Sequence, residues 1–291
     1  MDKYYNIGNH HFRVTGDHLI AAMERIPGFA PFEETPQQDV EFIVEEWMDD
    51  TKKIPSLQQI LYKYSFDNVV SEFGTTAEGY IHEQSPADQP PIRMWIRNGE
   101  NKVYLHGNFE SYLTSYAVGM GYELMTVDKD TVLVHSSCIV YNGKAILFLG
   151  KSGTGKSTHS RLWRENIPQC HTLNDDCPIV RIENGQAWVY GNPWSGKESY
   201  YRQERYPLTG FVRLSQAPYN KMTKLAKVLQ LYAALHPSFF SPFANDKRLY
   251  ENISSMIERL ISTIPIYHLK CLPDKEAALL SFHTFFPDEI L

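Results

Sequence analysis

The chain has 291 residues, 43% of them hydrophobic, so it can bury a large core in one large domain or two modest ones. Its net charge of -6, with no basic run longer than two residues, argues against a protein that binds nucleic acid or an anionic membrane. The four cysteines lack zinc-ligand spacing, the N-terminus lacks a signal-peptide core, and no apolar stretch is long enough to span a membrane. These features predict a cytoplasmic protein. Homo-oligomerisation is left open.

The first part of the chain is rich in aromatic and acidic residues and contains no catalytic pattern that we can name. Its patterns predict, in chain order, a strand at residues 40–44, a hairpin with strands at 92–97 and 102–106, and a helix at 109–125. These elements predict a smaller α+β region of unknown role over residues 1–125.

Short apolar strands begin near residue 126. The patterns predict strands at residues 131–135, 138–141, 145–149, 171–173, 179–181, 187–190, 208–214 and 266–269, and helices that start near 156, 223, 247 and 274. We therefore expect residues 126–291 to form an α/β domain with a mixed sheet.

A glycine-rich segment lies between the predicted strand at 145–149 and the predicted helix that starts near 156, and it matches the phosphate-binding pattern G-x-x-x-x-G-K-[ST] completely. The residues assigned to phosphate binding are Gly150, Ser152, Gly153, Thr154, Gly155, Lys156, Ser157 and Thr158. The alternative is a chance glycine turn before a helix, but the strand and helix on either side favour a nucleoside triphosphate site.

Each residue type in this loop suits the binding of a polyphosphate. Glycines allow successive backbone N–H groups to turn inward around an anion, and the helix N-terminus adds partial positive charge. Lys156 can reach the terminal phosphates, and the hydroxyl of Ser157 can ligate Mg²⁺.

An acidic pair, Asp175-Asp176, follows Lys156 by 19 residues (175 minus 156), which leaves room for one helix and one short strand. Carboxylates at such a strand end would face the γ-phosphate, where one can hold Mg²⁺ and the other can accept a proton from an attacking hydroxyl. An aspartate that caps a helix or turn is the structural alternative. The complete phosphate-binding loop favours metal binding and acid–base work.

Two further features have both structural and functional interpretations. His135 lies at a predicted strand end, where a histidine is usually structural, yet its place before the loop strand allows it to orient the acidic pair or a phosphate. Residues 191–197 partly repeat the loop pattern, but Glu198 replaces the required Ser or Thr and Pro193 lacks an N–H. They predict either a rigid lip, with Lys197 contacting phosphate or acceptor, or an ordinary turn.

The order of these pieces resembles the C-terminal domain of HPr serine kinase, within the superfamily that also contains the ATP-dependent phosphoenolpyruvate carboxykinases. The segments that carry the resemblance are residues 135–137, 150–158, 173–176 and 191–197, and the likeness extends over about residues 125–285. It implies a compact α/β domain in which Asp175 and Asp176 act as metal ligand and proton acceptor and His135 supports catalysis. The glycine-rich signature that engages HPr is not evident, so the acceptor is unidentified.

The sequence therefore predicts a kinase that uses ATP and Mg²⁺ to phosphorylate a hydroxyl, with serine of a peptide or protein and a small molecule as the acceptor classes. Lys156 and the loop amides would bind the phosphates, Ser157 and Asp175 would hold Mg²⁺, and Asp176 would activate the acceptor. The alternative is a non-catalytic, nucleotide-binding regulator or assembly protein. A hydrolase-type switch would need a Gln or Glu that positions water, and the sequence singles out none.

Overall fold

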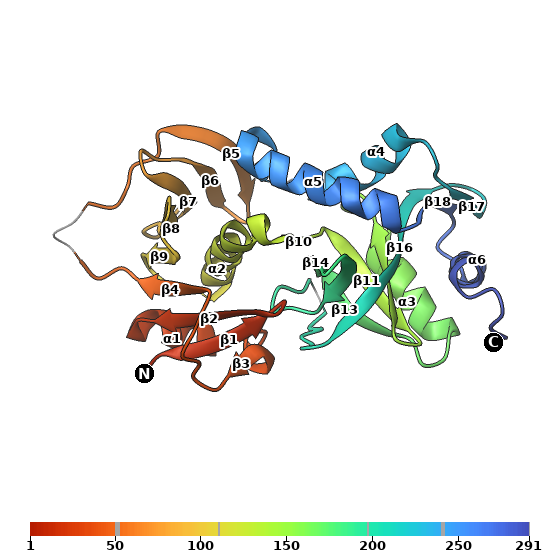
Figure 1. Cartoon of the computed structure of the whole chain (residues 1–291), viewed down its shortest axis with the longest axis horizontal. Helices are drawn as coiled ribbons and strands as arrows, with labels where there is room; N and C mark the ends of the chain where they lie inside the picture. Colours follow the sequence, from red (N-terminus) through yellow and green to blue (C-terminus); the bar gives the residue numbers. More distant parts are fainter. Residues whose placement is uncertain (50–52, 110, 197, 240–241, 291) are drawn as a thin grey trace. The chain divides into compact units, whose positions relative to one another are not determined.

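The computed structural model describes residues 1–49, 53–109, 111–196, 198–239 and 242–290. The chain forms two compact units with mixed β-sheets (Figure 1). The first unit comprises Met1–Lys129 and Pro242–Tyr250, and the second comprises Asp130–Ser241 and Glu251–Leu291.

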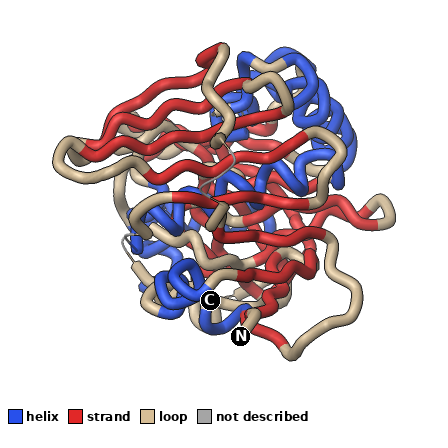
Figure 2. The backbone as a smooth tube through the Cα atoms, turned by 90° about the vertical axis from the view of Figure 1, so that its left-hand side faces the viewer, coloured by secondary structure: helices blue, strands red, loops and turns tan. Residues whose placement is uncertain are grey.

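The first unit is built on a nine-stranded sheet in the order β3-β1-β2-β4-β9-β8-β7-β6-β5, whose strands run side by side in Figure 2. Among the described strands of this sheet, only the pairs β2·β4 and β4·β9 are parallel. The strands are β1 Lys3–Ile7, β2 His10–Thr15, β3 Glu33–Glu34, β4 Phe42–Glu46, β5 Gln59–Phe66, β6 Val69–Thr75, β7 Gly79–Pro86, β8 Ile92–Arg97 and β9 Lys102–His106. The helical elements are α1 Asp17–Glu24, α2 Ser111–Thr126, and short 3₁₀ turns at Ala30–Phe32, Val127–Lys129 and Phe243–Asn245.

The predicted hairpin and helix of this unit are confirmed as β8, β9 and α2, and the predicted strand at 40–44 is β4. The sequence did not predict β1, β2 or β5–β7. In β2, buried residues alternate strictly with half-buried ones, as expected where one sheet face packs on a core. Helix α2 packs against β8 (Figure 1).

The second unit contains a mixed sheet in the order β10-β14-β15-β16-β12-β11-β13, and β18 adds to β16 and β17 to β18. Its strands are β10 Thr131–Leu133, β11 Ser136–Tyr141, β12 Lys144–Leu149, β13 His171–Asp176, β14 Ile179–Glu183, β15 Gln186–Tyr190, β16 Arg205–Gln216, β17 Lys221–Lys224 and β18 Ile266–Cys271. Its helices are α3 Lys156–Asn166, α4 Val228–Phe239, α6 Lys275–Phe285 and the part of α5 (Lys247–Thr263) that follows residue 250.

Strand β16 is the centre of this sheet because its first half pairs with β15 and its second half lies between β12 and β18. Helices α3 and α6 pack on each other over a core that includes Phe148, Trp163 and Phe282. β12 reads as a continuous apolar run, and five of its six residues are buried. This packing fixes the end of β12 and the start of α3, between which the glycine-rich loop lies.

Two expected elements of the second unit differ in the structure. The helix expected to start near residue 223 starts at Val228 as α4, because residues 221–224 form β17, whose pairing with β18 satisfies their backbone groups at the sheet edge. The strand expected at 131–135 ends at Leu133, since Val134 and His135 bond instead to the carbonyls of Pro178 and Ser238.

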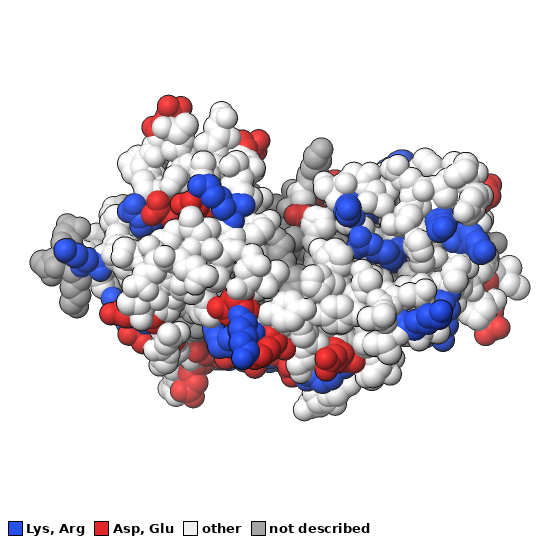
Figure 3. Space-filling view, turned by 90° about the horizontal axis from the view of Figure 1, so that it is seen from above, with Lys and Arg blue, Asp and Glu red and all other residues white. Residues whose placement is uncertain are grey.

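On the face shown in Figure 3, lysines and arginines occur in small groups separated by uncharged surface. None of the described helices combines the length and apolar character that a membrane crossing requires.

Candidate functional site

The glycine-rich loop connects β12 to α3 and presents open backbone toward solvent. Gly153 and Gly155 have positive φ angles of 77° and 107°, which L-residues with a Cβ rarely adopt. No atom lies within 4 Å of the position that a Cβ would take at either glycine. No side chain caps Gly155 at the start of α3, so the first-turn N–H groups remain available to an anion.

The hydroxyl-bearing side chains of the loop and of the first turn of α3 differ in exposure. Ser157 occupies the first turn of α3 and is exposed, as is Ser152 on the loop, whereas Thr154 and Thr158 are half-buried. Gly150 directly follows β12, and the position of a Cβ there would lie 3.0 Å from the Cβ of Thr154. The hydroxyls of Ser152 and Ser157 are therefore accessible to a ligand.

Lys156 turns back onto the start of its own loop. Its Nζ donates to the carbonyl oxygen of Gly150 at 3.1 Å and lies 2.8 Å from Nε2 of His135. Burial lowers the pKa of Lys156, while the carboxylates of Asp176 and then Asp175 oppose that shift. The ammonium is thus held by two neutral acceptors that a phosphate oxygen can replace.

His135 connects the lysine to the acidic pair. Burial, and next the charge of Lys156, lower the pKa of His135, so the imidazole is neutral near pH 7. With Nε2 accepting from Lys156, we assign the ring proton to Nδ1, which lies 3.7 Å from Oδ1 of Asp176. The structure therefore brings Lys156, His135 and Asp176 together in one chain of contacts.

Strand register explains why these residues meet. β11 pairs antiparallel with β12 on one side and β13 on the other, and it aligns Ser136 with both Leu149 and Asp176. The end of β12, the start of β11 and the end of β13 therefore share one sheet edge. The expectation that the acidic pair lies near the loop strand agrees with this register, with β11 between the two strands.

The two carboxylates of the pair lie on different faces of β13, since successive side chains of a strand alternate. Asp175 aligns with Ser137, whose Oγ lies 2.6 Å from Oγ of Ser160 on α3. Residues directly opposite each other in a sheet share a face, so Asp175 faces α3, where Ser157 lies one turn before Ser160. Asp176 instead approaches His135.

The turn after β15 lies against the acidic pair. The backbone N–H of Gly196 donates to the carbonyl oxygen of Asp175 at 2.9 Å, and Ser195 forms a bridge with Asp176. A Cβ at Gly196 would lie 2.5 Å from that carbonyl oxygen, so only glycine permits this approach. Lys197, the expected phosphate or acceptor contact, lies outside the described residues.

Two buried asparagines hold the strand end and the turn together. Nδ2 of Asn174 donates to the side-chain oxygen of Asn192 at 3.2 Å and to the carbonyl of Trp194 at 3.0 Å. Nδ2 of Asn192 donates to the carbonyl of Cys177 at 2.6 Å. Because buried amides without partners are costly, these bonds fix the backbone on both sides of the acids.

Sequence reasoning missed two residues at this edge. Cys177 groups with His135 and Asp176, and the donor atoms of the three lie within 4.8 Å of one another. Arg213 lies on β16 in register with Leu149, the last residue of β12. An arginine within the apolar run of β16 was the signal that could have found it.

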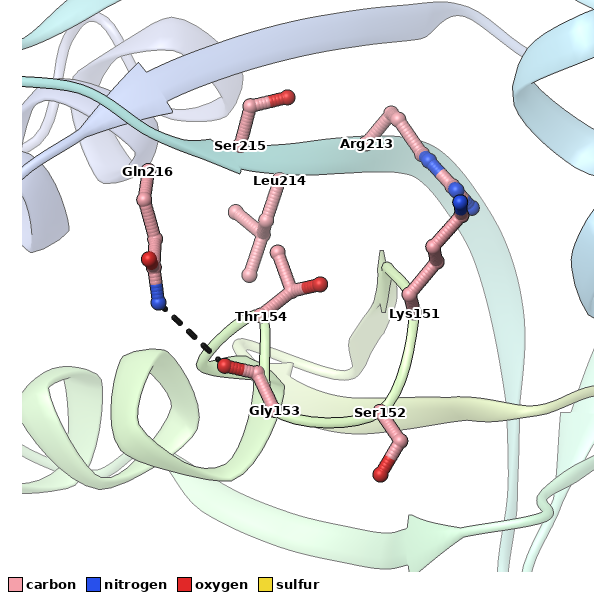
Figure 4. Close-up of a pocket in the computed structure, with 8 residues that line it drawn as sticks. All are labelled: Lys151, Ser152, Gly153, Thr154, Arg213, Leu214, Ser215 and Gln216. Carbon is pink, nitrogen blue, oxygen red and sulfur yellow. Dashed lines mark hydrogen bonds between the residues drawn. The ribbon is translucent and has the colours of Figure 1, made fainter.

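Arg213 lines an open hollow of about 450 Å³ beside the loop (Figure 4). The hollow is bounded by Lys151, Ser152, Gly153, Thr154, Arg213, Leu214, Ser215 and Gln216. Nε2 of Gln216 donates to the carbonyl of Gly153 at 3.3 Å and ties the loop to β16. Burial lowers the pKa of Arg213.

Comparison with known proteins gives little beyond this geometry. No family model and no curated protein matches the chain. Among solved structures, the chain is similar to the HPr(Ser) kinase/phosphatase from Coxiella burnetii, with 12% sequence identity and a TM-score of 0.30, over 54% of this chain and 94% of that chain. A likeness at this level does not indicate an activity for this chain.

Proposed function

We propose that this chain binds a nucleoside triphosphate, ATP, together with Mg²⁺, and transfers the γ-phosphoryl group to a hydroxyl of the serine type. The observation that carries the proposal is the convergence of the loop, Lys156, His135 and the acidic pair at one sheet edge. Phosphoryl transfer needs chiefly placement of the reactants and compensation of charge, and these groups suit both tasks.

In this proposal the phosphates bind at the N-terminus of α3, where the N–H groups of the first turn have no side-chain cap. Lys156 exchanges one of its neutral acceptors, His135 or the carbonyl of Gly150, for a phosphate oxygen. The exchange is favourable because a hydrogen bond between an ammonium and an anion is stronger than one to a neutral acceptor.

Ser157 and Asp175 are the proposed ligands of Mg²⁺. Both offer the hard oxygen donors that this ion prefers. Ser157 lies in the first turn of α3, and Asp175 lies on the face of the sheet that packs against α3. The cluster of His135, Asp176 and Cys177 contains a thiol, which suits softer metals instead. When bound, Mg²⁺ would neutralise charge on the phosphate oxygens.

Asp176 is the proposed acceptor of the hydroxyl proton. Its carboxylate is half-exposed, with 45% of the side chain accessible, so an incoming hydroxyl can reach it. His135 orients this carboxylate through the ring edge that lies 3.7 Å away. A positioned acid or base of this kind contributes about 10² to 10⁴ in rate.

The test is loss of the γ-phosphate from labelled ATP, measured for the native chain and for Asp176→Asn with Mg²⁺ present. We expect the variant to be slower by about a hundredfold or more and to bind ATP as before. Asp88→Asn is the matched control, because Asp88 is an exposed aspartate of the first unit. Equal rates for the native chain and Asp176→Asn would end the catalytic proposal and leave the nucleotide-binding regulator.

A further inference from the structure

The hollow beside the loop contains two cations and no acid. Lys151 extends from the loop and Arg213 from β16, and their side chains point toward each other in Figure 4. Among the described residues, neither side chain forms an ion pair or a hydrogen bond, and Nη1 of Arg213 is buried without a partner. A buried guanidinium nitrogen without an acceptor is unfavourable unless an anion binds there.

The hollow and the acidic pair lie on opposite sides of the loop strand. The strands lie in the order β16-β12-β11-β13. Arg213 is on β16, next to β12, whereas Asp176 is on β13, which lies beyond β11 on the other side of β12. If a triphosphate bound at the loop has its γ-phosphate toward Asp176, this strand order places β16 on the side where its α-phosphate and ribose would lie. The volume of about 450 Å³ falls within the range of about 300 to 1,000 Å³ typical of small-molecule sites.

We propose that this hollow holds the end of the nucleotide that is not transferred, with the α-phosphate bound by Arg213 and neutralised from the loop side by Lys151. The assignment rests on the proposed function and adds the direction in which the nucleotide lies. The bond between Gln216 and Gly153 keeps the loop at a fixed place beside β16, so the wall that carries Arg213 and the loop that carries Lys151 form one preorganised site.

The experiment measures the affinity of the full chain for ATP, ADP and inorganic pyrophosphate by calorimetry with Mg²⁺ present. Pyrophosphate has two phosphates to occupy the loop but no nucleoside. We expect Arg213→Gln to weaken ATP and ADP by about 10- to 100-fold and to change pyrophosphate binding by less than about threefold. Arg161→Gln is the control, because Arg161 is exposed on α3 and pairs with Glu165.

Two results for Arg213→Gln would overturn this assignment, and one result for the native chain would overturn the proposed function. Equal ATP affinity for native chain and Arg213→Gln would overturn the assignment and leave the proposed function intact, with the hollow free for an anionic group of the acceptor. Equal weakening of ATP and pyrophosphate would also overturn it, because Arg213 would then act as general positive charge. Absence of ATP binding by the native chain would overturn the proposed function itself.

A second variant covers the case in which Arg213→Gln does not fold. Lys151→Met changes an exposed loop residue, and we expect it to weaken ATP and ADP by about three- to tenfold while pyrophosphate binding stays within about twofold. Unchanged ATP affinity in a folded Lys151→Met variant would contradict the role given to the hollow.

Discussion

The Lys156 ammonium in this structure is engaged by His135 and by the carbonyl of Gly150, so phosphate binding requires it to change partners. When the phosphate oxygen takes the place of His135, the exchange frees Nε2 of the imidazole. The contact therefore couples occupation of the loop to the orientation of the imidazole beside Asp176. His135 is a positioning residue in this account, since it acts through Asp176 and Lys156.

This coupling gives a prediction for His135→Gln. Phosphoryl transfer at saturating ATP should slow by about a hundredfold, because Asp176 loses its orienting partner. ATP affinity should stay the same or rise, because Lys156 loses a competing acceptor. Comparison of kcat with the ATP dissociation constant separates the effects, and His283→Gln, on the exposed end of α6, is the control. A loss of affinity with an unchanged rate would contradict this role.

Gly196 provides a second prediction at this scale. Gly196→Ala would place a Cβ 2.5 Å from the carbonyl of Asp175 and push the turn away from the acidic pair. We expect transfer to slow by about 10- to 100-fold with little change in thermal stability, since Gly196 is exposed. Enzyme assays and melting curves check both parts, with Ser199→Ala of the same loop as control. Normal activity in Gly196→Ala would show that the turn does not position the acids.

The residues of this edge were predictable to different extents. The loop and the acidic pair follow a motif with fixed spacing, so their residues are visible in the sequence. Arg213 and Cys177 have no such spacing, because a parallel neighbour strand and a strand end bring them into place. The partner of the Lys156 ammonium was not predictable either, since it depends on side-chain packing.

At the scale of elements, sequence patterns succeeded where an element has a continuous apolar run, helical spacing or a clear turn signal beside it. β12, α3 and the hairpin β8–β9 follow their patterns. β17 does not, because a four-residue edge strand gains its stability from pairing with β18 and not from its own composition. In β5–β7 the buried positions do not alternate regularly with more accessible ones along the whole strand, which weakens the pattern that would identify them.

Strand β7 carries a pH-dependent contribution to stability. His82 is buried, its Nε2 lies 2.6 Å from Oγ of Ser71 on β6, and burial lowers its pKa from 6.5 to about 4. The unfolded chain therefore binds a proton between about pH 6.5 and about pH 4 that the folded chain does not bind. The free energy of unfolding must fall as the pH decreases through this window.

We expect this one residue to lower the free energy of unfolding by about 2 kcal/mol between about pH 7 and about pH 5. Hydrogen exchange of the β6 and β7 amides, corrected for intrinsic rates, measures the change in the native chain and in His82→Gln. Between about pH 7 and about pH 5, the free energy of unfolding of His82→Gln should fall by about 2 kcal/mol less than that of the native chain. His283→Gln should behave like the native chain. An equal fall in the free energy of unfolding of His82→Gln and of the native chain would show that His82 does not cause the pH dependence.

At the scale of the whole molecule, the first unit is not a single continuous piece of chain. Residues Pro242–Tyr250 join it from far along the sequence. Phe243 is buried against Phe73 with ring centroids 5.4 Å apart, and Nδ2 of Asn245 donates to the carbonyl of Leu61 at 2.7 Å. The change of pattern near residue 125 could not indicate this return, because a short segment with one aromatic anchor has no periodicity.

Phe243→Ala tests this architecture. Removal of a buried aromatic ring typically costs about 3 to 5 kcal/mol, so the amides of β5 and β6 should exchange faster. The amides of β12 should keep their protection, because that strand belongs to the second unit. Phe66→Ala, on the half-buried end of β5, is the control with a smaller expected effect. Unchanged exchange in β5 and β6 would contradict the role of Phe243 in the first unit.

We propose above that the loop amides and Lys156 bind a polyphosphate at the sheet edge that carries Asp175 and Asp176. Calorimetry of the full chain with ATP and Mg²⁺ tests it most directly, with Lys156→Ala and, as control, Lys144→Ala at the opposite end of β12. We expect saturable binding of ATP to the native chain and to Lys144→Ala, and at least about tenfold weaker binding to Lys156→Ala. No binding to the native chain, or equal affinity in Lys156→Ala, would contradict it.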